Sequence, residues 1–185
     1  MKKLILSGIV GGLIVFAWEM ISWMVMPWHG STMENFKSPA VVQEILVANA
    51  DKNGVYLIPA CPKKDGSKAT KDEMAKSHEQ MSKGPFALVV MSPQGIGSMN
   101  GLMAKGLGIQ ILSALLITGL LLRTKIKSYF SRVGFVVTVA LVAVTLVVLP
   151  NWNWWGFPLP FTLVGTADIL IGWLLAGLAI AKISD

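Results

Sequence analysis

Four long runs of apolar residues alternate with polar segments along the chain, and this alternation predicts the architecture. Each run holds about 20 residues with few charges, which is the length an α-helix needs to cross the hydrocarbon core of a bilayer. Glycine and alanine recur within the runs, so we expect the helices to pack through small residues. The expected transmembrane helices occupy 1–27, 98–122, 133–149 and 161–185, the last ending in a short tail.

The first run has a second interpretation, because Met1-Lys2-Lys3 followed by apolar residues is also the pattern of a secretory signal peptide. The apolar run continues to Pro27, however, and no small-x-small cleavage site precedes that proline. We therefore expect an uncleaved membrane anchor.

The segment 28–97 differs in character from the runs on either side of it. An amphipathic helix is expected to begin after Ser38 at Pro39, followed by the strand "GVYLIP". A second helix is expected between Thr70 and Gly84, followed by the strand "PFALVVMSP". Thr70 and Glu73 have the spacing of a capping box. The order predicts a small α+β unit in which two strands pair beneath two helices.

These elements together predict the fold class. We expect an all-α integral membrane bundle of four transmembrane helices with a small α+β exterior cap formed by 28–97. Two connections complete the bundle: a cytoplasmic loop at 123–132 and an exterior, tryptophan-rich loop at 150–160.

Composition and charge support a membrane protein and set its orientation. Hydrophobic residues make up 54% of the chain and charged residues only 14%, against about 25% charged in soluble domains. The net charge of +6 arises largely beside the apolar runs, at the N-terminus and in 123–132, where basic residues mark the cytoplasmic side. We therefore predict a multi-pass protein of the bacterial inner (plasma) membrane with cytoplasmic N- and C-termini, and no nucleic-acid partner.

The loop "PNWNWWGFPLP" is rich in tryptophan and proline, and two interpretations of it remain open. Tryptophan concentrates at the headgroup layer of a membrane, so the loop can be part of an aromatic belt. Its prolines also stiffen it, so it can instead be a fixed lid over a pocket.

Three ionisable residues, Glu19, Lys105 and Asp168, lie inside the expected transmembrane helices. At 1.5 Å per residue, each is about 10–12 Å from the outer end of its helix. Each also shares a helix face with glycine or alanine, which predicts that it points into the bundle. We expect one buried polar cluster beneath the 150–160 loop, either a structural salt bridge or a proton or ligand site. The residues expected at the mouth of this pocket are Ser22, Trp23, Trp28, His29, Trp152, Trp154 and Trp155.

Other chemistry receives weaker support. Ser22 near His29 suggests a nucleophile, but serine in a membrane helix usually bonds the carbonyl four residues back. His29 with Met20, Met24 and Met26 forms a weak candidate copper site, since thioether and imidazole suit Cu(I). Haem held by His29 and His78 is a further, weaker alternative. The lone Cys61 excludes an intrachain disulfide. The sequence identifies no cofactor.

Three segments in combination carry a resemblance: "WEMISWMVMPWHG", the charged insert after it, and "PNWNWWGFP" before the last run. Nearly the whole chain is similar to a group of small, functionally uncharacterised four-span membrane proteins of bacteria. The resemblance implies a bacterial inner membrane, and it carries over no activity, substrate or cofactor.

The function predicted first is that of a non-enzymatic integral membrane protein. It would bind a small ligand, lipid or partner protein at its exterior face, through the buried polar cluster capped by the tryptophan-rich loop. One alternative is a proton-coupled or ion-translocating component that works as an oligomer, because four helices make a thin wall for a transport path. A second is a copper- or haem-handling membrane protein. The expected partners are the lipid bilayer and either a second copy or another membrane protein.

Overall fold

The computed structural model describes residues 1–60 and 67–185 and divides the chain into two compact units. The bundle comprises Met1–Glu34 and Gly97–Asp185, and the insert comprises Asn35–Ile96. Cys61 lies outside the described residues.

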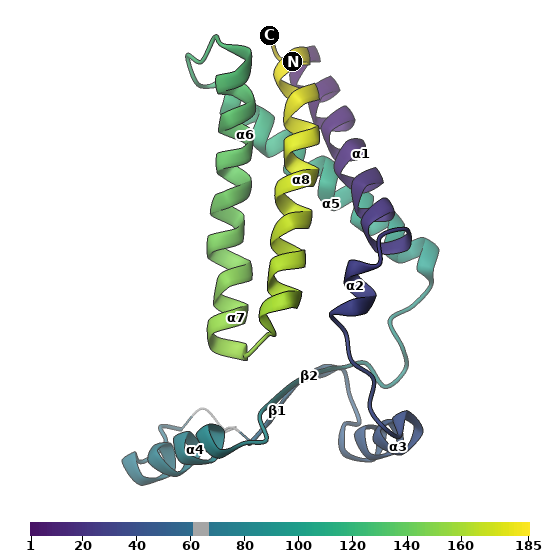
Figure 1. Ribbon diagram of the computed structural model, residues 1–185, viewed down its shortest axis with the longest axis vertical. Coiled ribbons are helices and arrows are strands. Elements are labelled where there is room, and N and C mark those ends of the chain that lie inside the picture. Colours follow the sequence, from purple (N-terminus) through teal and green to yellow (C-terminus); the bar gives the residue numbers. More distant parts are fainter. Residues whose placement is uncertain (61–66) are drawn as a thin grey trace. The chain divides into compact units, whose positions relative to one another are not determined.

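The bundle contains four helical segments that are long and apolar enough to cross a membrane, as the apolar runs predict. Three of them are single helices, and the other runs without a break through α6, η1 and α7; its two ends are labelled α6 and α7 in Figure 1. A single-turn helix, α2 (Trp28–Ser31), follows the first helix. The four segments are α1 (Lys2–Met24), α5 (Met99–Leu122), α6 (Tyr129–Ala143) with η1 (Val144–Val148) and α7 (Leu149–Trp155), and α8 (Leu159–Ile183).

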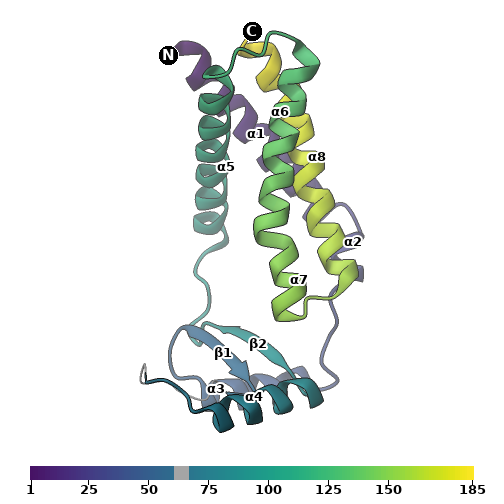
Figure 2. The ribbon, with the colours of Figure 1, turned by 90° about the vertical axis from the view of Figure 1, so that its left-hand side faces the viewer.

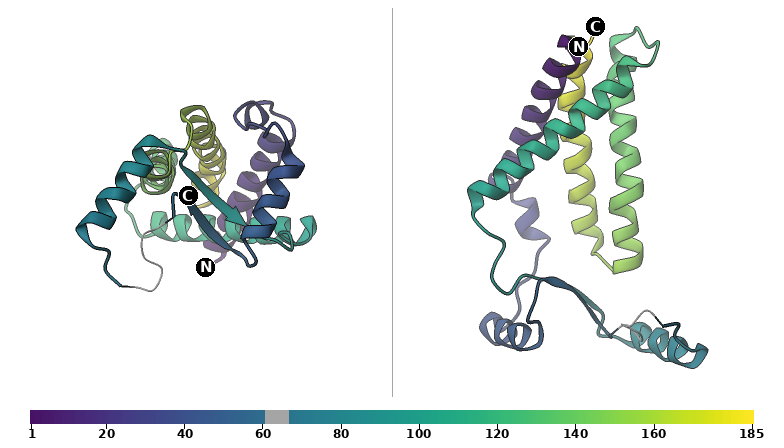
Figure 3. Two further views of the ribbon diagram at one scale, coloured as in Figure 1. Left: turned by 90° about the horizontal axis from the view of Figure 1, so that it is seen from below. Right: turned by 180° about the vertical axis from the view of Figure 1, so that it is seen from behind.

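Helix α8 occupies the middle of the bundle, between α1 and α6 (Figures 1 and 3). Both chain termini lie at one end, here called the terminal end, where Lys3 Nζ donates a hydrogen bond to the backbone oxygen of Asp185. Helix α2, the start of α5 and the connection from α7 to α8 lie toward the other end, here called the α2 end (Figure 1).

Close packing of α1 against α5 depends on glycine, which confirms the expected packing through small residues. A Cβ atom placed on Gly12 would lie 2.5 Å from the Cα atom of Ile111, closer than any real side chain approaches backbone. Gly8 packs in the same way against Leu115. The buried apolar core of the bundle consists of Val15, Ala114, Ile117, Leu121, Val136, Ala140, Trp173, Ala176 and Ile180.

The third helical segment is longer than the sequence predicts. The sequence predicts its end at residue 149, just before Pro150. Proline lacks an N–H and its ring clashes with the preceding turn, so a regular α-helix does not continue through it. Instead the turn before Pro150 widens into a π-helix, in which the Leu149 N–H bonds the Val144 carbonyl, and the helix continues to Trp155. Gly156, in the left-handed conformation with φ 67°, ends it. The expected loop at 150–160 is therefore mostly helix, and the connection to α8 is short.

The insert has the predicted order of elements: α3 (Pro39–Asn49), β1 (Gly54–Ile58), α4 (Lys71–Lys83) and β2 (Ala87–Met91). The strands pair antiparallel, with Val55 opposite Val90. The Thr70–Glu73 capping box is present, and Gly84 ends α4 as expected. Within the insert, α3 and α4 lie on the same side of the paired strands, toward opposite ends of them (Figures 1 and 2). Figure 3 shows the insert from two further sides. Ala50 and Ser77 are the only buried residues among those described in the insert.

Candidate functional site

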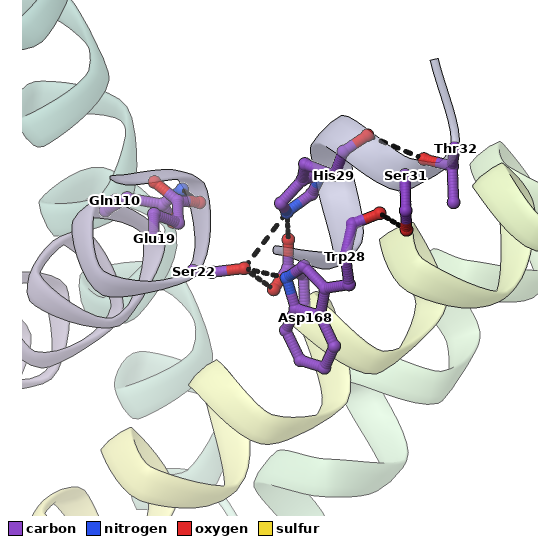
Figure 4. Close-up of polar contacts among 8 residues, drawn as sticks. All are labelled: Glu19, Ser22, Trp28, His29, Ser31, Thr32, Gln110 and Asp168. Carbon is purple, nitrogen blue, oxygen red and sulfur yellow. Dashed lines mark hydrogen bonds and ion pairs between the residues drawn. The ribbon is translucent and has the colours of Figure 1, made fainter. Parts of the chain in front are cut away.

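Polar side chains from α1, α2 and α8 meet at the α2 end of the bundle (Figure 4). The carboxylate of Asp168 on α8 accepts a hydrogen bond from the Ser22 hydroxyl on α1. Its other oxygen lies 2.7 Å from Nε2 of His29 on α2. The same nitrogen is 3.0 Å from Ser22 Oγ, and Trp28 Nε1 donates to Ser22 Oγ at 2.8 Å. Ser22, Trp28, His29 and Asp168 are called the polar cluster below.

The turn that follows α1 brings Trp28 and His29 to this position. The chain reverses after Met24, and Pro27 precedes the single turn of α2. Such a short helix is not stable alone. The hydroxyls of Ser31 and Thr32 close it by donating to the carbonyls of Trp28 and His29, at 2.9 and 3.0 Å.

Two members of the polar cluster are buried, Trp28 and Asp168 are partly buried, and ring contacts hold the imidazole in place. Ser22 is fully buried, and His29 is 5% exposed. The Trp23 ring stacks on the imidazole, with centroids 3.8 Å apart and planes 11° apart. Trp28 meets the imidazole edge-on at 6.2 Å. Buried polar groups destabilise a protein unless they are hydrogen-bonded, and the hydrogen bonds of this cluster join elements far apart in the sequence.

The hydrogen-bond roles show what the cluster can do chemically. An ionised carboxylate only accepts, so Ser22 donates its proton to Asp168 and His29 Nε2 carries a proton toward the same carboxylate. In a Ser-His-Asp triad, by contrast, the histidine uses one nitrogen for the serine and the other for the acid. Here a single nitrogen faces both, and the serine is inaccessible. The arrangement is suited to holding a proton and not to activating a nucleophile.

Glu19 lies on α1 one turn before Ser22, and its carboxylate accepts a hydrogen bond from the Gln110 amide on α5. Two carboxylates are thus present near the α2 end, as the sequence predicts.

Lys105 does not join them. Its side chain is exposed, and within residues 1–60 and 67–185 it makes no ion pair with Glu19 or Asp168. The prediction relied on Gly101 and Gly108 as markers of the packed face of α5. A Cβ atom on Gly108 would meet nothing within 4 Å, and one on Gly101 would meet only the hydroxyl of Ser98, which caps the same helix. Neither glycine therefore packs against another helix. The packed face of α5 carries Gln110, Ile111 and Ala114 instead.

The tryptophans of the third segment do not cover the polar cluster. Trp152, Trp154 and Trp155 lie on α7, with exposures of 47%, 75% and 42%, and make no ring contact with the cluster. The aromatic surroundings of the cluster are Trp23 and Trp18, whose ring is 6.1 Å from that of Trp28. The sequence analysis did not select Trp18 or Gln110. The one available signal for Gln110 was an uncharged polar residue within an apolar run.

The described residues do not form a metal centre of the usual kind. Within residues 1–60 and 67–185 no three His, Cys, Asp or Glu side chains are grouped to hold a metal ion. Nε2 of His29 is already engaged with Asp168. Met24 and Met26 are 70% and 38% exposed, and Met20 is partly buried. His78 lies on α4, in the other unit.

Comparison with protein-family models, with curated proteins and with solved structures finds no match to this chain. The function is therefore argued from the geometry alone.

Proposed function

We propose that this chain is a non-enzymatic, multi-pass protein of a bacterial inner membrane, and that the small ligand of its polar cluster is the proton. In this proposal the α2 end faces the exterior. The basic residues at the N-terminus and in 123–132 lie at the opposite end of the four helices, which supports this orientation.

The observation that carries the proposal is the 2.7 Å contact between His29 Nε2 and an Asp168 oxygen inside an apolar bundle. Placing an ionisable group in such surroundings costs free energy. Chains of Asp, Glu and His side chains inside membranes commonly bind and transfer protons. The burial of Ser22 and His29 leaves little room for a larger ligand. A proton needs no room.

The protonation state of His29 sets the strength of a contact between two elements. With a charged imidazolium the bond to Asp168 is charge-assisted, about twice as strong as a bond between neutral groups. Nearby charged groups are Asp168 on α8 and Glu19 on α1, while α5 contributes the neutral Gln110 and the exposed Lys105. Because α2 leads directly into the insert, proton binding would regulate how firmly that connection is held.

Proton transport by a single copy has less support. Between the polar cluster and the terminal end, the helices meet through Val15, Ala114, Ala176 and Ile180, which are at most 3% exposed. The buried hydroxyls of Ser7 and Thr118 have no hydrogen-bond partner among the described residues, so they do not form a continuous hydrogen-bonded path from the polar cluster. The proposal is therefore proton binding from one side.

The test is the thermal unfolding midpoint of the purified protein between pH 5 and pH 9. Histidine is the side chain that ordinarily changes charge in this range. The contact between His29 Nε2 and Asp168 is strongest when the imidazole is charged, so the proposal expects His29 to stabilise the protein most on the acid side. That stabilisation should decline as the pH rises.

The control is His78→Gln, because His78 is exposed on α4. His29→Gln should flatten the pH profile, whereas His78→Gln should leave it as in the wild type. A His29→Gln profile that follows the wild-type profile would mean that the polar cluster does not bind the proton.

A further inference from the structure

A hollow of about 150 Å³ lies between the third helical segment and α8. It is lined by Val148 of η1, Asn151 of α7, Phe157 in the connection, and residues of α8. None of these residues belongs to the polar cluster. The α8 residues along the hollow are Phe161, Thr162, Gly165 and Ile169.

Two local features keep the hollow open. A Cβ atom on Gly165 would meet nothing within 4 Å, so the absence of a side chain there leaves space beside α8. The π-helical turn Val144–Val148 inserts one extra residue per turn just before α7, which displaces the helix that forms the opposite wall. The rings of Phe157 and Phe161, 5.5 Å apart, close one side.

The lining is apolar along α8 and polar at Asn151. The Thr162 hydroxyl donates to the Pro158 carbonyl at 3.0 Å, so its polar atom is already satisfied. Within residues 1–60 and 67–185, the Asn151 carboxamide has no hydrogen-bond partner. From Phe161 to Ile169 the hollow follows α8 for about 12 Å at 1.5 Å per residue. A free amide next to an apolar hollow is complementary to an amphiphile, because an amphiphile carries a polar group at the end of an apolar chain.

We propose that this hollow binds one acyl chain of a membrane phospholipid, with the ester group of that chain at Asn151. Exposed Trp152, Trp154 and Trp155 on the same helix mark the headgroup level when the four segments span a membrane. Asn151 then lies near the glycerol esters, and Gly165 and Ile169 lie in the hydrocarbon. A space of about 150 Å³ holds a group the size of benzene, so it takes part of one chain and not a whole lipid. The inference requires the membrane placement but not the proposed proton binding.

The test uses liposomes of phosphatidylethanolamine and phosphatidylglycerol that contain a phospholipid with a photoactivatable diazirine in mid-chain. After illumination, cross-linked peptides are mapped by mass spectrometry. The wild type should give cross-links concentrated on Val148 and on 161–169. Cross-links spread evenly over other exposed apolar positions, such as Leu116 on α5 and Leu146, would overturn the proposal.

A matched pair of glycine variants separates a built site from general lipid contact. Gly165→Leu fills the hollow, whereas Gly134→Leu adds the same side chain to an exposed position on α6 where a Cβ atom also meets nothing within 4 Å. Displacing about two methylene groups of a bound chain should reduce cross-linking in 161–169 about tenfold in Gly165→Leu. Gly134→Leu should leave it unchanged, and equal yields in the two variants would contradict a specific site.

A change at the other end of the hollow tests the same site without filling it. Asn151→Leu removes the proposed partner of the ester group, so native mass spectrometry in mild detergent should show less co-purified phospholipid than in the wild type. The same measurement decides the matter if Gly165→Leu does not fold. Unchanged retention in Asn151→Leu would contradict the contact between Asn151 and the ester group, and with it the proposal.

Discussion

Ser22 links the two halves of the polar cluster, since it donates to Asp168 and accepts from Trp28. Replacing it with alanine leaves the partly buried indole N–H of Trp28 without its acceptor and removes one donor from the partly buried Asp168 carboxylate. Each unsatisfied buried polar group costs about 1–3 kcal/mol. We therefore expect Ser22→Ala to lower the free energy of unfolding by about 2 kcal/mol, measured by denaturant titration in detergent.

A double-mutant cycle shows whether this loss comes from the Trp28 bond. Trp28→Phe removes the indole donor and keeps an aromatic ring, so it should cost less in the Ser22→Ala background than in the wild type. Trp154→Phe, at an exposed position on α7, provides the control and should be additive with Ser22→Ala. Additivity of Trp28→Phe as well would show that the bond contributes nothing to stability.

The individual residues of the cluster were largely predictable. Ser22, Trp28, His29 and Asp168 are all unusual for an apolar run or its end, and the sequence analysis selected each of them. Their mutual bonding was not predictable, because it depends on the chain reversal at Pro27 that carries His29 back against α1. The sequence placed His29 at the mouth of the site, whereas the structure places it in direct contact with Asp168.

Among the helices, the α1–α5 contact depends on a missing side chain. Gly12 has the backbone of Ile111 against it, so an alanine there must push the two helices apart. Overpacking of this kind costs about 1–3 kcal/mol. Gly108→Ala, on the open face of α5, should be neutral or slightly stabilising, because alanine favours a helix over glycine.

Unfolding free energies of Gly12→Ala and Gly108→Ala, measured side by side, test this assignment of faces. If Gly108→Ala proves the more destabilising variant, then α5 presents to its neighbours the face that the sequence analysis expected, with Lys105 turned inward. Glycine spacing alone could not decide between the faces, since both helices carry glycines at helical intervals. Only the contacts distinguish Gly12 from Gly108.

The existence of the helices was predictable from length and composition, but one of their ends was not. Proline disrupts the interior of a regular α-helix, and the predicted helix ends just before Pro150. The local widening at Val144–Val148 accommodates it, and the tryptophans became part of a helix instead of a lid. In the insert, the capping box at Thr70 and the glycine at 84 gave both boundaries of α4 correctly.

For the chain as a whole, both proposals depend on which end of the bundle faces outward. The positive-inside rule places the N-terminus and 123–132 in the cytoplasm, and the structure puts both at the terminal end of the bundle. The polar cluster and Asn151 are then near the exterior surface. A proton would reach the cluster from that side.

Cysteine labelling in intact cells tests this orientation directly. A maleimide that does not cross membranes should react with Cys61, whose place in the sequence is within the insert. In a Cys61→Ser background, Ser31→Cys on α2 should also react, because that position is exposed. Lys125→Cys, between α5 and α6, should react only after the membrane is permeabilised, because a charged connection with Arg123 and Lys127 beside it is retained in the cytoplasm. If Lys125→Cys is labelled in intact cells and Ser31→Cys is not, then the protein has the opposite orientation in the membrane. The cluster would then exchange protons with the cytoplasm, and the acyl-chain site would lie in the inner leaflet.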